Sequence, residues 1–521
     1  MARIHEYQGK ALLKENGIPV PEGKPAFSAD EVKQIAKDLG EPVVIKAQAW
    51  TTSRFAKGLI QFADNPEEAY KKAKDLFGKT VNNFPVEVLL VEKKINIQSE
   101  YYGGIIINDA LKTPEIIFSS RGGSGIEEIA QKYPDSIARM PIDIIDGLKD
   151  YHARNLIAKT GIHGKTQMNL ANLLVKLWQI AKKYEARSAE INPIMQTADG
   201  RFLAADCRIT VDDYAVFRHP ELGIEIAREF GNPPTPLDKI AYDVEKNDYR
   251  GTFYFIQLEQ GFKKGDRYVA FHGAGGGGSM MSMDALQSRG FKIANFTDTS
   301  GNPPASKVYR AAKIMLSQKN IDGYFGSGSG VASQEQVNSA RGLVKAFRED
   351  RLSVPAVIRL GGNMEDEALE ILTKCTDDLP VQVEGYKKDD PADYCAKRLK
   401  ILIDNHKKQN LKFEDEEYTT RSLIENAKHP YEFKSMTGRV IFDHSFCLNC
   451  ETKVCIEVCT PEILKLEKDK PVLGITEDEA AKGKCTECLA CELECYSHGN
   501  KGCYVELPIK GLIDYRIKMG H

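Results

Sequence analysis

The stretch Cys485-Thr-Glu-Cys-Leu-Ala-Cys-Glu-Leu-Glu-Cys495 decides the fold of the C-terminal part of this chain. Its spacing, C-x2-C-x2-C-x3-C, wraps four thiolates around a [4Fe–4S] cube. The two runs of this kind hold eight of the twelve cysteines, so we predict two clusters in one small domain. The second run lies upstream, at Cys447, Cys450, Cys455 and Cys459, followed by Pro461.

Two such runs in tandem resemble a two-cluster ferredoxin. In that pattern the last cysteine of each run crosses to the other cluster. The x4 gap after Cys450 departs from the commonest spacing and lengthens that loop. The resemblance implies one cube on Cys447, Cys450, Cys455 and Cys495, and the other on Cys485, Cys488, Cys491 and Cys459.

Two other chemistries of clustered cysteines stay open. Structural zinc also accepts four thiolates, although usually from two C-x2-C knuckles with a longer spacer. Disulfides need an oxidising compartment, and no secretory leader follows Met1. We favour iron–sulfur over zinc and zinc over disulfides. The isolated cysteines are predicted to be small buried hydrophobic residues: Cys207, Cys375, Cys395 and Cys503.

The composition indicates a multidomain globular protein. At 521 residues there is room for three or four domains, and the hydrophobic (42%) and charged (28%) fractions are ordinary. The net charge of −3 offers no electrostatic case for nucleic acid or an anionic membrane, and no apolar run is long enough to span a bilayer. We therefore expect a cytoplasmic protein without nucleic-acid or membrane partners.

The order of helical and strand patterns predicts an α/β and α+β multidomain fold. The first part mixes both patterns, including an amphipathic helix over His5–Glu15. Beyond Gly231–Pro236, strands alternate with helices, which favours parallel βαβ units. We predict domains over 1–235 and 236–405, a polar linker over 406–440, and a cysteine-rich domain with a tail over 441–521.

Polar residues of the first domain have the composition of a Mg–nucleotide site. Glu190 and Asn192 share one face of a predicted strand, and Asp206 ends the partner strand of that hairpin. Lys46 ends an earlier strand, before a loop that contains Arg54. Oxygen ligands hold the hard cation, and lysine and arginine neutralise phosphates. Taken alone, carboxylates on a hairpin are more often simply solvated.

An ordered series of motifs resembles one enzyme family over about residues 1–400. The motifs are His5-Glu-Tyr-Gln8, Val44-Ile-Lys46, Val91-Glu92, Gly122-Gly-x-Gly-Ile-Glu127, Glu190-Ile-Asn-Pro193, Ala204-Ala-Asp206 and Phe217-Arg-His-Pro-Glu-Leu222. In this order they resemble the nucleotide-binding β subunit of succinyl-CoA synthetase and the N-terminal part of ATP-citrate lyase. The resemblance implies an ATP-grasp fold followed by a flavodoxin-like domain, with the small ferredoxin-like domain after them.

The resemblance also implies a role for each polar residue of the site, with ATP or GTP as nucleotide. The family's glycine-rich loop after the lysine is replaced here by Ala49-Trp-Thr-Thr-Ser-Arg-Phe55, which keeps Arg54 without the backbone freedom of glycine. By resemblance, Lys46 and Arg54 contact phosphates, Glu92 and Glu100 lie near adenine and ribose, Asn192 and Asp206 bind Mg²⁺, and Glu190 steadies a phosphohistidine.

Three glycine-rich loops each follow a predicted strand and precede a helix, at His272–Gly278, Ser300–Pro303 and Gly326–Gly330. Any one of them could be only a tight turn. Together they point to one crevice at the carboxyl ends of a parallel sheet, where such sheets bind ligands. By resemblance this crevice holds the carboxylate substrate, with His272 as a catalytic residue and Gly273, Ser329, Gly330 and Val331 as substrate contacts.

The acid is predicted to differ from those of the two named enzymes. In succinyl-CoA synthetase the position of His272 is an asparagine, and Ser300-Gly-Asn-Pro303 looks more like the citrate enzyme. Arg359-Leu-Gly361 nevertheless lacks the second arginine of the citrate enzyme. We infer a carboxylic acid other than succinate or citrate.

The resemblance implies half of an NDP-forming acid–CoA ligase. In this family an α subunit supplies the CoA-binding domain and the phosphorylated histidine. We predict acyl-CoA synthesis through an acyl phosphate and a phosphohistidine, with an α-type partner that binds CoA and a redox partner at the ferredoxin-like domain. Two rival functions are an electron-transfer subunit built on a non-catalytic ligase scaffold, and an ATP-coupled reductase acting on a CoA ester.

Overall fold

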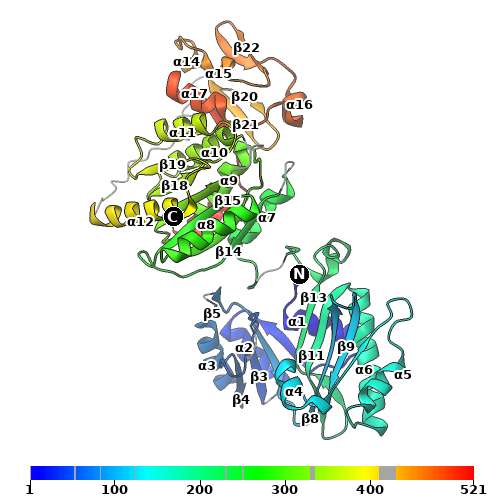
Figure 1. Cartoon of the computed structure of the whole chain (residues 1–521). Coiled ribbons are helices and arrows are strands. Elements are labelled where there is room, and N and C mark those ends of the chain that lie inside the picture. Colours follow the sequence, from blue (N-terminus) through cyan, green and yellow to red (C-terminus); the bar gives the residue numbers. More distant parts are fainter. Residues whose placement is uncertain are drawn as a thin grey trace. The chain divides into compact units, whose positions relative to one another are not determined.

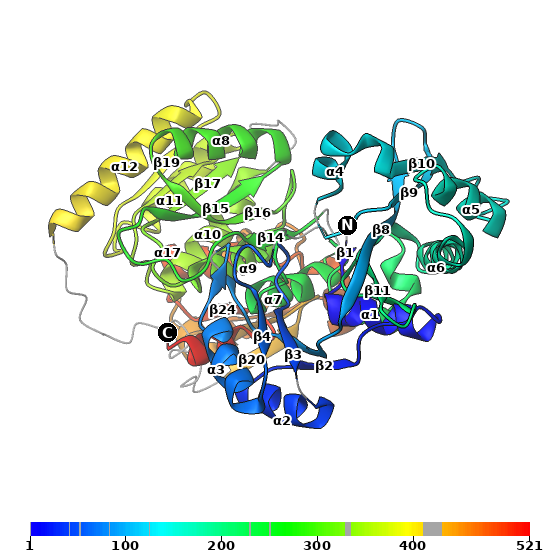
Figure 2. The same ribbon diagram turned by 90° about the horizontal axis from the view of Figure 1, so that it is seen from below.

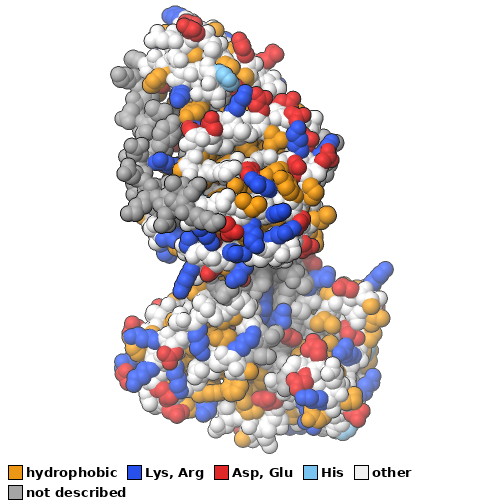
Figure 3. All heavy atoms as spheres, turned by 60° about the vertical axis from the view of Figure 1, so that its left-hand side comes forward, with side chains coloured by type: hydrophobic (Ala, Val, Ile, Leu, Met, Phe, Trp, Pro, Cys, Tyr) orange, Lys and Arg blue, Asp and Glu red, His pale blue; other side chains and the backbone are white. Residues whose placement is uncertain are grey.

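The chain folds into two compact units, Met1–Pro234 and Thr235–His521 (Figure 1). No helix among the residues that the structure describes is both long and apolar enough to cross a bilayer. On the face drawn in Figure 3, side chains of both charges are interspersed, in line with the small net charge of −3. The computed structural model describes residues 2–40, 42–51, 54–82, 84–123, 125–228, 231–248, 252–328, 335–409 and 430–520.

The first unit contains a large antiparallel sheet in the order β1-β13-β11-β8-β9-β10, with β12 paired to β11. Helices α5 and α6 pack on it (Figure 1), because α6 turns a stripe that includes Leu170, Leu174 and Leu177 inward. The strands are β1 (Ala2–Arg3), β8 (Ile97–Asn108), β9 (Thr113–Ser119), β10 (Ile137–Pro141), β11 (Ala186–Thr197), β12 (Phe202–Ala204) and β13 (Cys207–Val211). The helices are α1 (Glu6–Glu15), α4 (Ile126–Lys132), α5 (Asp150–Ala158), α6 (Gly164–Lys183), η1 (Pro134–Ser136), η2 (Val216–Arg218) and η3 (Pro220–Leu222).

A smaller antiparallel sheet, β2-β7-β3-β4, completes the first unit with α2 and α3 packed side by side on it (Figure 2). Both helices begin at side-chain caps: Ser28 accepts from the Glu31 amide, and Asn65 from the Glu68 amide. The elements are β2 (Gly23–Ala26), α2 (Ala29–Leu39), β3 (Val43–Ala47), β4 (Ile60–Ala63), α3 (Pro66–Phe77), β5 (Thr80–Val81), β6 (Phe84–Pro85) and β7 (Leu89–Lys93).

The second unit is built on a sheet in the order β14-β16-β15-β17-β18-β19. Only β14 runs antiparallel to its neighbour, so the predicted parallel βαβ units are confirmed. Helices α8 and α12 cover one face, and α7, α9, α10 and α11 lie on the other (Figure 2). The elements are α7 (Pro236–Lys246), β14 (Tyr254–Gln257), β15 (Tyr268–Ala274), α8 (Gly276–Ser288), β16 (Lys292–Asp298), α9 (Ala305–Leu316), β17 (Gly323–Gly328), α10 (Gln336–Glu349), β18 (Ala356–Arg359), α11 (Glu365–Lys374), β19 (Val383–Tyr386) and α12 (Ala392–Gln409).

The cysteine-rich segment packs on α9 and α10 as part of the second unit (Figure 1). One hydrophobic core runs through both, since Val308 and Val344 share it with Phe442 and Val505. Of the predicted linker, residues 430–434 form β20, and residues 410–429 lie outside the described residues. The elements are β20 (Pro430–Lys434), β21 (Arg439–Asp443), α14 (His444–Cys447), α15 (Val454–Glu457), β22 (Leu464–Glu467), β23 (Lys470–Leu473), α16 (Glu477–Glu479), η4 (Ala480–Lys484), α17 (Ala490–His498), β24 (Cys503–Glu506) and α18 (Leu512–Met519).

Candidate nucleotide site and cysteine-rich sites

A cavity of about 690 Å³ opens between the two sheets of the first unit. Residues of the small sheet form one wall, and residues of the large sheet with α1 form the other. The structure therefore brings together side chains that lie far apart in the sequence. Six of the predicted site residues line this cavity: Lys46, Arg54, Glu100, Glu190, Asn192 and Asp206.

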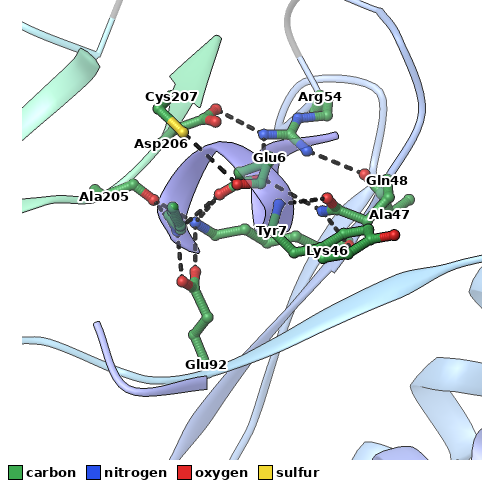
Figure 4. A network of polar contacts seen from close by, with 11 residues as sticks. Glu6, Tyr7, Lys46, Ala47, Gln48, Arg54, Glu92, Ala205, Asp206 and Cys207 are labelled. Atoms are coloured by element: carbon green, nitrogen blue, oxygen red, sulfur yellow. Dashed lines mark hydrogen bonds and ion pairs between the residues drawn. The ribbon is translucent and has the colours of Figure 1, made fainter. Parts of the chain in front are cut away.

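Lys46, in β3, is held by three oxygen atoms (Figure 4). Its Nζ lies 3.0 Å from Glu6 Oε1, 2.8 Å from Glu92 Oε2 and 2.6 Å from the Ala205 carbonyl oxygen. Burial lowers the pKa of Lys46, but the carboxylates of Glu6 and Glu92 outweigh it and raise that pKa above its usual range. The lysine is therefore a fixed, fully charged group.

Arg54 joins the loop after β3 to the opposite wall (Figure 4). Its Nη2 donates to Glu6 Oε2 at 2.7 Å and to Asp206 Oδ2 at 2.6 Å, and Nη1 donates to the Ala47 carbonyl oxygen at 3.1 Å. These contacts hold the loop that contains Arg54 in place. This is the loop in which the glycines expected from the family resemblance are replaced by other residues. Asp206, the predicted magnesium ligand, is here paired with an arginine.

Glu6 and Lys10, on the first turns of α1, belong to the charged network beside the cavity, and they were not identified from the sequence. Lys10 Nζ lies 2.8 Å from Glu6 Oε1 and 2.5 Å from Glu92 Oε1, and both residues are buried. The available signal was a carboxylate and a lysine four residues apart, on the face that also carries the buried Leu13. Glu92 is 2% exposed and bonded to both lysines, which makes it an anchor of Lys46.

The remaining wall carries the predicted magnesium ligands and Glu190. The Asn192 amide donates to the Asp206 carbonyl oxygen at 3.1 Å, which sets the two residues side by side. The Asn192 side-chain oxygen accepts from the Gly123 amide at 2.9 Å. Glu190 accepts from the Tyr102 hydroxyl at 3.1 Å, and burial raises the pKa of its carboxyl. Carboxylate and carboxamide oxygens facing one cavity fit a hard divalent cation.

The crevice predicted in the second unit is lined by residues at the carboxyl ends of β15, β17 and β18. His272 is 5% exposed, and its ring nitrogens lie 2.7 Å from the Tyr324 hydroxyl and 3.2 Å from Thr299 Oγ1. Gly273 follows it within β15. The other predicted substrate contacts lie outside the described residues: Ser329, Gly330 and Val331.

One of the two predicted cysteine sets lines a common cavity. Cys459, Cys485, Cys488 and Cys491 line one cavity of the second unit, together with Pro461. In the other set, burial and the neighbouring thiols of Cys495 and Cys450 raise the pKa of Cys447 to about 12. Burial and Cys495 likewise raise the pKa of Cys455 to about 12. Within the described ranges, no three or more His, Cys, Asp or Glu side chains are grouped so that they could hold a metal ion.

The fold and the cavity of the first unit define a nucleotide-binding ATP-grasp protein. A family profile for the ATP-grasp domain matches residues 3–196, and one for the citrate-binding region of ATP citrate lyase matches residues 263–397. Both matched stretches end before Cys447, the first cysteine of the two runs.

Two curated relatives specify the family further. The GDP-forming succinate–CoA ligase β subunit of Thermus thermophilus is 35% identical over 71% of this chain and 93% of its own length. The ADP-forming β subunit 2 of Archaeoglobus fulgidus is 36% identical over 73% of this chain and 94% of its own. The chain belongs to the family of NDP-forming succinate–CoA ligase β subunits, which are acid–thiol ligases.

A solved structure agrees at the level of the fold. The ATP citrate lyase of Methanothrix soehngenii, in complex with citrate and coenzyme A, matches with a TM-score of 0.59 and 18% identity. The match covers 77% of this chain and 99% of that one. The predicted ATP-grasp multidomain fold is confirmed.

Proposed function

We propose that this chain is the β-type subunit of a nucleotide-dependent acid–CoA ligase that works with an α-type subunit. The balanced reaction converts a carboxylate, a nucleoside triphosphate and CoA into an acyl-CoA, a nucleoside diphosphate and phosphate. The acyl phosphate and a phosphohistidine of the partner are its intermediates. The observation that carries the proposal is the cavity of the first unit, which is lined by two cations (Lys46 and Arg54), two residues with oxygen ligands (Asn192 and Asp206) and the partly buried carboxyl group of Glu190.

Each residue of the cavity has a role in this proposal. Lys46 and Arg54 would contact the phosphates as fixed positive charges, and Asn192 and Asp206 would hold Mg²⁺. Bound Mg²⁺ neutralises charge on phosphate oxygens. Glu190 would accept a hydrogen bond from the phosphohistidine ring, since its carboxyl lies on the same wall. The family includes GDP-forming and ADP-forming members, so both nucleotides are candidates.

The substrate is a carboxylic acid bound at the crevice of the second unit. The relatives are named for succinate, and the profile that covers this region is named for citrate. The crevice carries the imidazole of His272, hydrogen-bonded to Tyr324, on its wall. Because both ring nitrogens have partners, a role in shaping the crevice is favoured over proton transfer.

The cysteine-rich segment is proposed to carry two [4Fe–4S] clusters in a ferredoxin-like arrangement. The support is that four cysteines from both runs line one cavity, as the crossed ligand pattern requires. A four-iron cube holds its thiolates farther apart than a single ion does, so the absence of a mononuclear site among the described residues is compatible with it. Such clusters supply one-electron chemistry, which keeps an ATP-coupled reductase acting on a CoA ester as the second candidate function.

The test is an anaerobic assay of this chain with and without an α-type subunit. We expect acyl-CoA only from the pair, in the presence of Mg²⁺ and ATP or GTP, with one member of a panel that includes succinate and citrate. Synthesis by this chain alone would contradict the two-subunit proposal. Release of phosphate that depends on a low-potential reductant and a CoA ester would favour the reductase instead.

Nucleotide binding by this chain tests the site itself. Lys46→Met and Asp206→Asn should each weaken Mg–nucleotide binding at least about a hundredfold, because a charged hydrogen bond or a metal ligand is lost. Lys37→Met, an exposed lysine on α2, is the matched control and should bind normally. Calorimetry that shows unchanged affinity in both site variants would contradict the phosphate site.

A further inference from the structure

Glu6 occupies the centre of the charged network beside the nucleotide cavity (Figure 4). Its side chain is 3% exposed, and its two carboxylate oxygens contact different cations. Oε1 lies 2.8 Å from Lys10 and 3.0 Å from Lys46, while Oε2 lies 2.7 Å from Arg54. Glu6 is thus the carboxylate shared by the two cations that are proposed to contact phosphates.

The backbone of α1 gives Glu6 little freedom to move. A Cβ atom on Gly9, one turn further along α1, would lie only 2.8 Å from Cys207 Sγ, so the helix lies tightly against β13. The Glu6 carbonyl oxygen also faces Cys207 Sγ at 3.6 Å. The helix therefore holds the Glu6 carboxylate in a fixed position. Lys46 and Arg54 are in turn held in place by their ion pairs with this carboxylate.

The two carboxylates that pair with Arg54 differ in exposure. Asp206, the other partner of Arg54, has a side chain that is 34% exposed, whereas that of Glu6 is 3% exposed. Both residues line the cavity, but Asp206 is the more accessible of the two to an entering cation. Arg54 can therefore leave Asp206 for a phosphate while Glu6 keeps hold of it.

The charges of the network cancel. Three carboxylates (Glu6, Glu92, Asp206) face three cations (Lys10, Lys46, Arg54), so the sum is −3 + 3 = 0. Burial raises the pKa of Glu6, but the adjacent Lys10, Lys46 and Arg54 outweigh it and hold that pKa well below its usual range. Glu6 thus stays ionised, and these six residues offer no surplus positive charge to a bare triphosphate.

We propose that Glu6 is a positioning residue of the nucleotide site, which aligns Lys46 and Arg54 and sets the local charge so that the nucleotide binds as its Mg²⁺ complex. This inference rests on the proposed contacts of Lys46 and Arg54 with phosphates. A buried charge acts more strongly on a more highly charged ligand. Removing the charge of Glu6 should therefore strengthen the binding of uncomplexed ATP more than the binding of Mg–ATP.

The experiment measures the dissociation constants of ATP with Mg²⁺ and with EDTA by calorimetry, using the full chain. In Glu6→Gln, the ratio of the constant in EDTA to that in Mg²⁺ should fall at least about fivefold. Glu6→Asp keeps the charge and should retain the ratio of the natural protein. Glu15→Gln, an exposed glutamate on the same helix, is the matched control and should also retain it.

A second variant covers the case in which Glu6→Gln does not fold. Lys10→Met removes a positive charge that is not proposed to contact phosphate, so it should raise the ratio. Ratios that stay constant in both variants, with only a lower melting temperature, would show a purely structural role and overturn the inference. Normal binding by Lys46→Met would instead overturn the proposed phosphate site, so the two failures are distinguishable.

Discussion

His272 shows how burial changes the chemistry of a single residue. Sequence reasoning placed it at a catalytic position after a strand, and the structure encloses its ring between Tyr324 and Thr299. Burial lowers the pKa of His272 to about 3, so the imidazole is neutral at physiological pH. A neutral ring with two hydrogen-bonded nitrogens can shape the crevice but has no free lone pair for a proton.

The same pKa predicts a pH dependence of stability. Below about pH 6.5 the unfolded chain takes up a proton at His272 that the folded chain does not. The free energy of unfolding should therefore fall on acidification towards pH 3, by up to about 1.4 kcal/mol per pH unit for this group. Urea unfolding at pH 7 and pH 5 should show a smaller loss in His272→Asn than in the natural protein. Equal losses would contradict this account.

At the scale of elements, α10 connects the crevice to the cysteine-rich segment. Gln336 and Ser339 near its start line the crevice, while Lys345 lies under the cysteine-rich segment. Lys345 Nζ contacts Glu492 Oε1 at 2.7 Å and Glu349 Oε1 at 2.8 Å, with 1% of its side chain exposed. Since Glu492 follows Cys491, this ion pair holds a predicted cluster ligand against the ligase fold.

Lys345→Met should destabilise the second unit by about 3–5 kcal/mol, because the buried carboxylate of Glu492 loses its counter-ion. Lys374→Met on α11 is the control: its partner is also a glutamate four residues away, but its side chain is 67% exposed. We expect the control to change stability by less than about 1 kcal/mol. Urea unfolding followed by circular dichroism measures both. Similar values for the two variants would show that the buried network contributes little.

At the scale of the whole molecule, the nucleotide cavity and the cysteine sets belong to different compact units. Each unit has its own hydrophobic core. A change in metal content of the second unit should therefore leave the nucleotide cavity of the first unit intact.

Cys488→Ser tests this independence. Anaerobically prepared natural protein should contain about eight irons, four per cube, and the variant about four. The affinity for Mg–ATP should be the same in both, because Cys488 lies in the second unit. Zinc in place of iron would contradict the cluster proposal, and a loss of nucleotide binding would show that the two units are coupled.

Local sequence determined the alternation of strands and helices in the second unit and the residue types at the candidate sites. Alternating strand and helix patterns predicted the parallel sheet of the second unit because periodicity is a local property. Strand periodicity likewise placed Glu190 and Asn192 on one strand, β11, and both line the cavity. The cysteine spacing predicts two ligand sets for iron–sulfur clusters, and this assignment stays a prediction.

Only the tertiary structure decided how the charges are paired. Glu6, Lys46, Glu92 and Asp206 lie far apart in the sequence, and no local pattern shows that the carboxylate of Glu6, besides Lys10 on its own helix, pairs with Lys46 and Arg54. The placement of Lys345 beneath Glu492 likewise depends on how α17 packs on α10. The physical reason is that the pairing of buried charges depends on desolvation and on packing between elements that are distant in the sequence. Residue type and spacing, in contrast, determine structure only within a single helix, strand or loop.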